Sequence, residues 1–261
     1  MYWPRPLRED GTTMNLTTQA IVLRAVNYKE SDKILTLLTR DSGKLTVTAR
    51  ASRKKGGGIS AAAQLLVWSD VVLKEYRGRW TLSEAVTDRE FRGVREDLDK
   101  MALGSYFAEV TELLAPEGVP APELLALLLN SLYALESLDR PLPLVKAAFE
   151  LRAMCLAGYA PALDRCALCG AEQPEEPRFH LREGVLHCRD CRVGEGISLP
   201  LDAGSLAAMR HIVSCPSKRL FSFRLSGPGE KRLGDAAEGF LLTQLERGFR
   251  TLDFYKQVKS H

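Results

Sequence analysis

The chain carries two Cys-x-x-Cys pairs separated by eighteen residues, Cys166 with Cys169 and Cys188 with Cys191. Two such pairs bring four thiolates to one tetrahedral metal ion, and the intervening length is that of a short hairpin that reverses the chain. Residues 179–181 and 184–186 read as two short apolar strands on either side of Arg182 and Glu183. The spacing therefore predicts a zinc-ribbon-like knuckle over residues 164–194 that holds one structural Zn2+.

Other interpretations of these cysteines fit the sequence less well. In a thioredoxin-like redox motif the Cys-x-x-Cys pair follows a strand and precedes a helix, and neither pair does so here. Four cysteines close the coordination shell, whereas a catalytic zinc keeps an open position. His187, next to Cys188, is a competing ligand, but we expect a solvated histidine in the hairpin. Cys155 and Cys215 have no partner at ligand spacing and are expected to be small buried residues.

The N-terminal third of the chain reads as a series of strands. Five segments of alternating or continuous apolar character follow one another, at residues 19–26, 33–39, 44–51, 64–76 and 79–86. Turn-forming residues separate them, among them Gly43 and Gly78. Five strands in about 70 residues predict a small closed barrel of OB type over residues 16–92, with an antiparallel sandwich as the alternative. Residues 1–15 read as a polar leader, with Met14 as an alternative start.

After residue 92 the apolar residues recur with helical spacing. The pattern predicts helices over residues 98–114, 123–138, 144–156, 204–213 and 236–258. Prolines and glycines end the first three, and the last is expected to return and complete a helical bundle. The expected fold class is therefore α+β and multidomain: an OB-type β-barrel followed by a helical domain over 93–261, with the four-cysteine knuckle inserted.

Charge is distributed unevenly along the chain. Between Ala20 and Thr87, twelve Lys and Arg stand against six Asp and Glu, whereas between Glu96 and Ala160 four basic residues stand against ten acidic ones. This separation indicates a basic module that faces phosphates and an acidic module that faces helices or basic protein segments. Solvated faces that differ by chance are the alternative.

Single strands of nucleic acid bind to positive grooves with aromatic faces on which bases stack. The candidates in the barrel are Arg24, Lys29, Lys33, Lys44, Arg50, Arg53, Lys54, Lys55, Lys74, Tyr76, Arg77, Arg79 and Trp80, with Tyr28 as a further aromatic. We favour the run from Arg53 to Lys55, because it leads into three glycines and a flexible basic loop can close over a phosphate backbone. Trp68 is expected in the core.

The sequence also excludes several classes of protein. It lacks the G-x-S-x-G, H-E-x-x-H and G-x-G-x-x-G motifs, the P-loop spacing, and the H-x-E signature of deaminases. No apolar run reaches the roughly 18 residues that span a bilayer, and the N-terminus has no signal-peptide core. We therefore expect a cytoplasmic, nucleoid-associated protein that is not an enzyme and does not bind membranes.

Three separated stretches resemble the RecO family of bacterial recombination mediators. They are AIVLRAVNYKESDKILTLLTRDSGKLTVTARASRKK, LRAMCLAGYAP leading into LDRCALCG, and FLLTQLERGFRTLDFYKQV. The resemblance covers nearly everything from Leu16 onward. It implies a role in DNA repair in which the protein binds single- and double-stranded DNA and anneals complementary strands. It also implies that, with RecR, the protein helps to load the recombinase onto DNA coated by single-stranded-DNA-binding protein. Some members lack the cysteines, so the zinc here would be a scaffold.

Two other functions remain open at this point. One is a zinc-stabilised scaffold whose basic barrel binds structured RNA, and the other is a metal-dependent hydrolase. Competition between single-stranded DNA and folded RNA separates the first from a recombination mediator, and loss of activity on chelation identifies the second.

Overall fold

The computed structural model describes residues 13–53 and 58–259. The chain divides into two compact units, Met1–Leu125 and Ala126–His261, which we call the barrel unit and the helical unit. The helix α4 (Pro122–Ser137) runs across this division. Within the described ranges, no helix is both long enough and apolar enough to cross a membrane.

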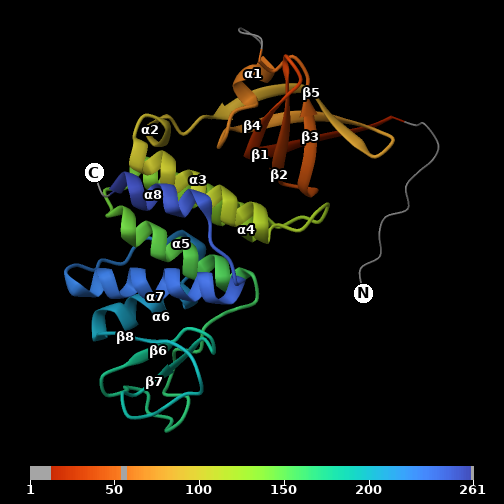
Figure 1. Cartoon of the computed structure of the whole chain (residues 1–261). Helices are drawn as coiled ribbons and strands as arrows, with labels where there is room; N and C mark the ends of the chain where they lie inside the picture. The colour runs from red at the N-terminus through yellow and green to blue at the C-terminus, as the bar shows by residue number, and fades with distance from the viewer. Residues whose placement is uncertain (1–12, 54–57, 260–261) are drawn as a thin grey trace. The chain divides into compact units, whose positions relative to one another are not determined.

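The barrel unit is built on five strands. They are β1 (Met14–Tyr28), β2 (Asp32–Thr39), β3 (Gly43–Ala49), β4 (Trp68–Tyr76) and β5 (Arg79–Arg89). They form a closed barrel in the order β1-β2-β3-β5-β4, in which β3 and β5 are parallel and the other neighbours antiparallel (Figure 1). The predicted OB-type barrel is therefore confirmed, and the sandwich is excluded. A short helix, α1 (Gly58–Ala62), precedes β4 where the sequence predicted only a loop.

Strand β1 is long enough to pair with two neighbouring strands. Its first half pairs with β4, with Met14 opposite Glu75, and its second half pairs with β2, with Tyr28 opposite Asp32. The register shifts between Val22 and Arg24, and such a bulge lets a strand bend around a barrel. Because β1 begins at Met14, residues 14 and 15 lie in the strand and not in the expected leader.

Alternate residues of the strands fill the barrel. The core includes Ala20, Val22, Leu35, Leu37, Leu45, Val47, Ala49, Val71, Leu73 and Leu82. Trp80 is half-buried and packs against this cluster. Trp68 is buried, as the sequence predicted.

The helices α2 (Arg92–Arg95) and α3 (Leu98–Leu114) belong to the barrel unit, although the sequence predicts a helical domain from residue 93. Helix α3 packs against β1. Ile21 and Leu38 alternate with core positions yet are completely buried, so the outer face of β1 and β2 is covered where these two residues pair. Near the end of α3, the Glu112 carboxylate accepts a hydrogen bond of 2.9 Å from Arg24 Nε, and its carbonyl accepts one of 2.8 Å from Lys44 Nζ. These contacts attach α3 to the barrel, and periodicity alone does not reveal them.

The segment after α3 lies against the start of β3. Lys44 N–H donates to Pro116 O and Gly118 N–H donates to Lys44 O, each at 3.1 Å. Gly43 has a left-handed backbone, with φ of 65°, and a Cβ at this position would lie 2.0 Å from Val119 O. Only glycine therefore fits at position 43.

We expect Gly43→Ala to destabilise the barrel unit by more than about 3 kcal/mol, because backbone clash adds to conformational strain. Gly118→Ala is the matched control. Gly118 has the same φ of 65° but nothing within 4 Å of a Cβ, so only the left-handed backbone cost of about 1–2 kcal/mol applies. Urea denaturation of the two variants measures the difference, and equal losses would contradict the docking of Val119 on β3.

The helical unit combines helices with a small sheet. After α4 come α5 (Leu142–Leu156), α6 (Ala203–Ser214), the 3-10 turn η1 (Ser217–Arg219), α7 (Pro228–Leu245) and α8 (Arg250–Lys259). Helix α5 packs against α6 and α7. The sheet has the order β7-β6-β8, from β6 (Arg178–His180), β7 (Val185–His187) and β8 (Ser198–Pro200), and is drawn below the helices in Figure 1.

The single helix predicted over residues 236–258 is wrong. It is two helices, because Glu246 takes a left-handed backbone with φ of 51° and ends α7. The hairpin predicted between the cysteine pairs is confirmed as β6 and β7. The third strand, β8, was not predicted.

A buried charge network joins three helices of this unit. Lys146 of α5 is 7% exposed, and its Nζ lies 2.8 Å from both the Glu150 carboxylate of the same helix and the Glu238 carboxylate of α7. Lys256 of α8 forms a second ion pair with Glu238. Burial raises the pKa of Glu238, but Lys146 and Lys256 outweigh it and lower that pKa below the usual value. Burial lowers the pKa of Lys146, but Glu150 and Glu238 raise it overall.

Lys146→Ala is expected to cost about 3–5 kcal/mol, because it leaves the buried Glu150 carboxylate without its ion pair to Lys146. Lys231→Ala, which removes an exposed ion pair on α7, is the control and is expected to cost under about 1 kcal/mol. The contribution of Glu238 is present at neutral pH and falls as the pH drops through about 4.3 towards its lowered pKa. The free energy of unfolding of the variants and of the unaltered protein, measured at pH 7 and at pH 4, gives the cost of each substitution and its pH dependence. A cost of Lys146→Ala that is the same at both pH values would contradict the network.

Candidate metal centre and nucleic-acid interface

The four cysteines of the knuckle come together as the spacing predicts. The Sγ atoms of Cys166, Cys169, Cys188 and Cys191 all lie within 4.8 Å of one another. Those of Cys169 and Cys188 are 3.6 Å apart. In a tetrahedron with metal–sulfur bonds of about 2.3 Å, the sulfurs lie about 3.8 Å apart. The cluster is therefore close enough to hold one metal ion, and its donors are the soft thiolates that zinc prefers.

Backbone hydrogen bonds fix this geometry. Cys166 N–H donates to Ala171 O at 2.8 Å and Gly170 N–H donates to Cys166 O at 3.0 Å, which closes a tight turn after the first pair. Gly170 takes a φ of 75° in this turn. Ala167 N–H donates to Leu186 O at 2.8 Å and so ties the first pair to the hairpin that carries the second.

The electrostatics of the cluster favour a cation. Burial raises the pKa of the Cys166 thiol, but backbone N–H groups of Cys169, Leu168 and Cys188 that point at its sulfur lower the pKa to about 6. The hydrogen bond between Cys191 and Cys166 raises the pKa of Cys191 to about 12. The Cys166 thiolate therefore forms readily, whereas Cys188 and Cys191 hold their protons more tightly. A divalent cation would replace those protons and offset the repulsion between thiolates.

His187 is not the solvated histidine that the sequence predicts. Its side chain is buried, with Nε2 2.8 Å from Ser198 Oγ and Nδ1 2.8 Å from Cys188 O. The prediction is wrong because β8 supplies Ser198, and nothing in the hairpin sequence reveals that strand. His180 is equally buried, and its Nδ1 accepts a hydrogen bond of 3.1 Å from Glu183 N–H.

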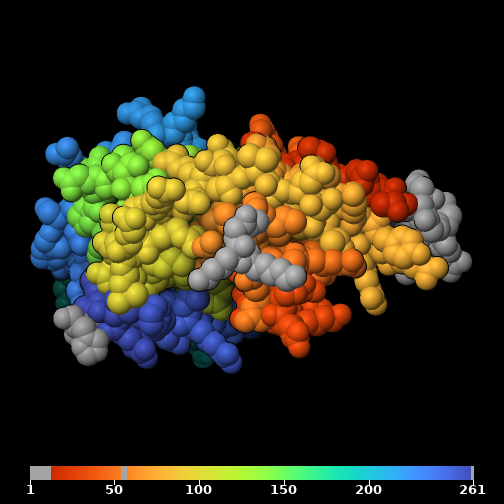
Figure 2. Space-filling model, turned by 90° about the horizontal axis from the view of Figure 1, so that it is seen from above, coloured from red at the N-terminus to blue at the C-terminus, as the bar shows by residue number. Residues whose placement is uncertain are grey.

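One group of basic side chains gathers where β3 ends. This turn cluster consists of Lys29, Arg50 and Arg53, all exposed. Arg53 N–H donates to Ser31 O and Arg53 Nη1 to Glu30 O, each at 3.0 Å, so the β1–β2 turn and the end of β3 are fastened together. Figure 2 views the barrel from the end that carries α1, close to where β3 ends. Tyr28 is exposed beside the cluster, with Lys29 Nζ 5.3 Å from its ring.

A second group lies on the β4–β5 hairpin. This hairpin cluster consists of the exposed residues Lys74, Tyr76, Arg77 and Arg79. The turn has two residues, Arg77 with φ of 49° and Gly78 with φ of 75°. Positive φ at both positions matches the type I′ turn that suits a two-residue hairpin. The Arg77 guanidinium lies 5.2 Å from the centre of the Tyr76 ring.

The hairpin cluster and the turn cluster lie at opposite ends of β3, because β3 pairs in parallel with β5. Val47 lies opposite Trp80 and Thr48 opposite Thr81, so the two threonines point outward where Val47 and Trp80 point inward. Arg79 is one residue before this pairing, beside Thr46. From Thr46 to Arg50 the strand rises about 13 Å. We call this outer surface, with Thr46, Thr48 and Thr81, the seam.

Several of the predicted nucleic-acid residues take part in contacts within the barrel unit. The Lys44 side chain is 14% exposed and contacts Glu112 and Glu117. Arg24 pairs with Glu112, and Lys33 Nζ donates to Ala63 O at 3.1 Å. Trp80 packs against the barrel core. The favoured run is divided, because Arg53 belongs to the turn cluster whereas Lys54 and Lys55 lie outside the described residues.

Comparison with protein families matches both parts of the chain. The model described as "Recombination protein O N terminal" matches residues 14–89, and the one described as "Recombination protein O C terminal" matches residues 95–253. The first match coincides with the five barrel strands, and the second runs from α2 into α8.

Curated relatives match over most of their length. The DNA repair protein RecO of Acetivibrio thermocellus is 31% identical over 244 residues, which cover 93% of this chain and 97% of that protein. That of Symbiobacterium thermophilum is 34% identical, covering 92% and 96%. That of Anaeromyxobacter sp. (strain K) is 36% identical, covering 91% and 94%.

Proposed function

This chain belongs to the RecO family of DNA repair proteins, and on this premise we propose that it is a recombination mediator that binds single- and double-stranded DNA and anneals complementary strands. With a RecR-type partner, it helps to load the recombinase onto DNA coated by single-stranded-DNA-binding protein. It acts in the cytoplasm on the nucleoid and has no catalytic group of its own.

The observation that carries this proposal is the placement of two exposed basic clusters at the two ends of the seam. A rise of about 13 Å corresponds to roughly four nucleotides at about 3.4 Å each, which lies within the range of sites known for OB folds. We propose that a single strand runs along the seam from the hairpin cluster to the turn cluster. The outer face of β1 and β2 is covered around Ile21 and Leu38, whereas the seam on β3 and β5 carries the exposed Thr46 and the half-buried Thr48 and Thr81.

The backbone at the cluster tips supports a binding role. Lys29 and Arg77 both have positive φ, at 52° and 49°, in turns where glycine or asparagine would be less strained. Such strain costs about 1–3 kcal/mol per residue and persists where function selects the side chain. The positive φ places Lys29 beside Tyr28 at the tip of one turn and Arg77 beside Tyr76 at the tip of the other.

Annealing of two strands needs positive charge on the protein but no catalytic group. Two DNA backbones repel each other, and cations that neutralise phosphates on both reduce that repulsion. Base pairing then supplies the driving force. The four-cysteine centre takes no part in this step. We propose that it holds Zn2+ and keeps the knuckle folded.

A strand-annealing assay tests the function without assuming a partner. The purified protein is expected to accelerate pairing of matched oligonucleotides at least about tenfold over the uncatalysed rate and to leave mismatched ones unpaired. Folded RNA is the competitor. If RNA displaces DNA at equal concentration and annealing is absent, the protein is an RNA-binding scaffold instead.

Stacking on the exposed tyrosines gives a further expected result. Tyr76→Ala should weaken single-strand binding by about 1–3 kcal/mol, because one base loses its aromatic partner. Tyr76→Phe keeps the ring and should bind like the unchanged protein. Fluorescence anisotropy with an oligothymidine measures both, and equal weakening in the two variants would show that the hydroxyl group, and not stacking, is responsible.

A further inference from the structure

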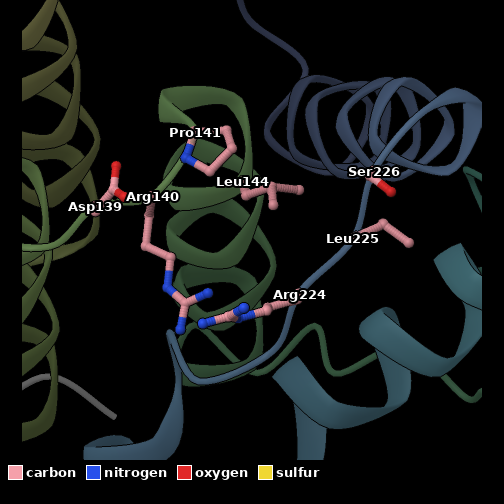
Figure 3. Close-up of a pocket in the computed structure, with 7 residues that line it drawn as sticks. All are labelled: Asp139, Arg140, Pro141, Leu144, Arg224, Leu225 and Ser226. Carbon is pink, nitrogen blue, oxygen red and sulfur yellow. The ribbon is translucent and has the colours of Figure 1, made fainter.

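The helical unit contains a pocket of about 430 Å3. Its lining comes from the residues that lead into α5 and its first turn and from the segment before α7: Asp139, Arg140, Pro141, Leu144, Arg224, Leu225 and Ser226 (Figure 3). The pocket is far in sequence from the barrel strands and from the four cysteines.

Two arginines meet at this pocket without an anion between them. The guanidinium groups of Arg140 and Arg224 point toward one another, whereas the carboxylate of Asp139 points away from both (Figure 3). Over residues 13–53 and 58–259, no ion pair or hydrogen bond is found for either guanidinium. The two guanidinium groups repel each other, and an anion between them is attracted by both and offsets this repulsion.

The surroundings add positive potential. Helix α5 begins at the pocket with Pro141 as its N-cap, without a side-chain capping bond and without an acidic residue in its first turn. No acidic side chain of its own first turn therefore offsets its N-terminal dipole. Three residues of the segment 214–229, Arg224, Leu225 and Ser226, line the pocket, and this segment contains Lys218, Arg219 and Arg224 and no acidic residue. The pocket thus lies beside a basic stretch and not beside an isolated pair.

We propose that this pocket is a second nucleic-acid site, in which Arg140 and Arg224 bind one phosphodiester group of a DNA strand. The inference rests on the proposed function, because annealing requires a place for a second strand. Guanidinium groups suit phosphate because their planar N–H donors bind it in a bidentate manner. Pro141 and Leu225 provide an apolar wall for the sugar. A strand carries one charge per nucleotide, so we expect its neighbouring phosphates to meet Lys218 and Arg219 of η1.

The test measures capture of a second strand by the full-length protein. The protein is first saturated with a donor-labelled oligothymidine, and a non-complementary, acceptor-labelled oligonucleotide is then titrated in. Energy transfer reports the ternary complex. Arg140→Gln combined with Arg224→Gln is expected to weaken capture of the second strand about fivefold at ~0.1 M salt, since the two arginines bind one phosphate and losing that contact costs about this factor there. Binding of the first strand should change less than about twofold.

Two further variants keep the outcome clear. Arg250→Gln combined with Lys259→Gln removes two exposed charges from α8 and should leave capture unchanged. Ser226→Asp keeps both arginines but places a carboxylate in the pocket, and it should weaken capture as the double arginine variant does. Capture that is unchanged in the Arg140 and Arg224 variant, while the first strand still binds, overturns the inference and leaves the proposed function standing.

Other results separate the sources of failure. If the unaltered protein does not bind the first strand, the proposed function itself fails. If the arginine variant loses binding of a labelled Asp- and Glu-rich peptide but still captures the second strand, the pocket recognises an acidic protein segment and the inference is wrong.

Discussion

Cys188→Ser is expected to abolish stoichiometric zinc binding and to unfold the knuckle around residues 164–194. Structural zinc contributes about 10–16 kcal/mol of apparent binding free energy in isolated zinc-finger peptides at neutral pH, which exceeds the stability of most domains. The knuckle consists of three-residue strands and tight turns, so little else holds it. Metal analysis should fall from one zinc per chain to nearly none, and limited proteolysis should cut between the cysteine pairs.

Cys155→Ser is the matched control for this prediction. Cys155 lies on α5 outside the metal cluster, and its pKa is raised by burial, so it is a poor ligand. This variant should keep its zinc. DNA binding in the barrel unit should stay within about twofold in both variants, because the proposed zinc would be a scaffold for the knuckle only. Retention of zinc by Cys188→Ser, or loss of DNA binding together with the metal, would contradict the assignment.

Removal of the seam's basic ends is expected to have the second large effect. The variant replaces four exposed residues by alanine: Lys29, Arg50, Arg77 and Arg79. Each phosphate contact contributes about 0.7 to the salt slope of single-strand binding, or about fivefold in affinity at ~0.1 M salt. Loss of four contacts should therefore weaken binding roughly 600-fold. These side chains take no part in the barrel core, so the fold should survive, and circular dichroism checks this.

A control variant with the same change in net charge distinguishes phosphate contacts at the seam from attraction of DNA by the net charge of the protein. Arg92, Lys231, Arg250 and Lys259 are all exposed and belong to neither cluster. Their replacement by alanine should weaken binding by less than about fivefold, since surface charges beyond a Debye length of about 10 Å are screened. Equal weakening in both variants would mean that DNA responds only to net charge.

The features that depended on local spacing were readable from the sequence. The alternating or continuous apolar character of five segments in residues 19–86 indicated all five strands of the barrel, because these strands fill its core with apolar side chains. The Cys-x-x-Cys spacing identified the metal cluster, since the geometry of such a site is set within each short pair. The hairpin between the pairs followed for the same reason.

The features that depend on distant contacts were not readable. Nothing near Lys44 in the sequence indicates that Glu112, 68 residues away, accepts its hydrogen bond and takes it out of the candidate interface. The burial of His187 depends in the same way on Ser198 in a strand of three residues. The break at Glu246 lies in a stretch with uniform helical spacing, where a left-handed residue interrupts the pattern without a proline. Tertiary packing decides each of these points.

The proposed function requires phosphates to be bound at the two ends of the seam, and the salt dependence of oligothymidine binding measures this. Plots of log affinity against log salt concentration should differ in slope by about 2.8 between the unaltered protein and the four-residue variant of the seam. The control variant should run parallel to the unaltered protein. A common slope for all three proteins would place the DNA elsewhere and contradict the account.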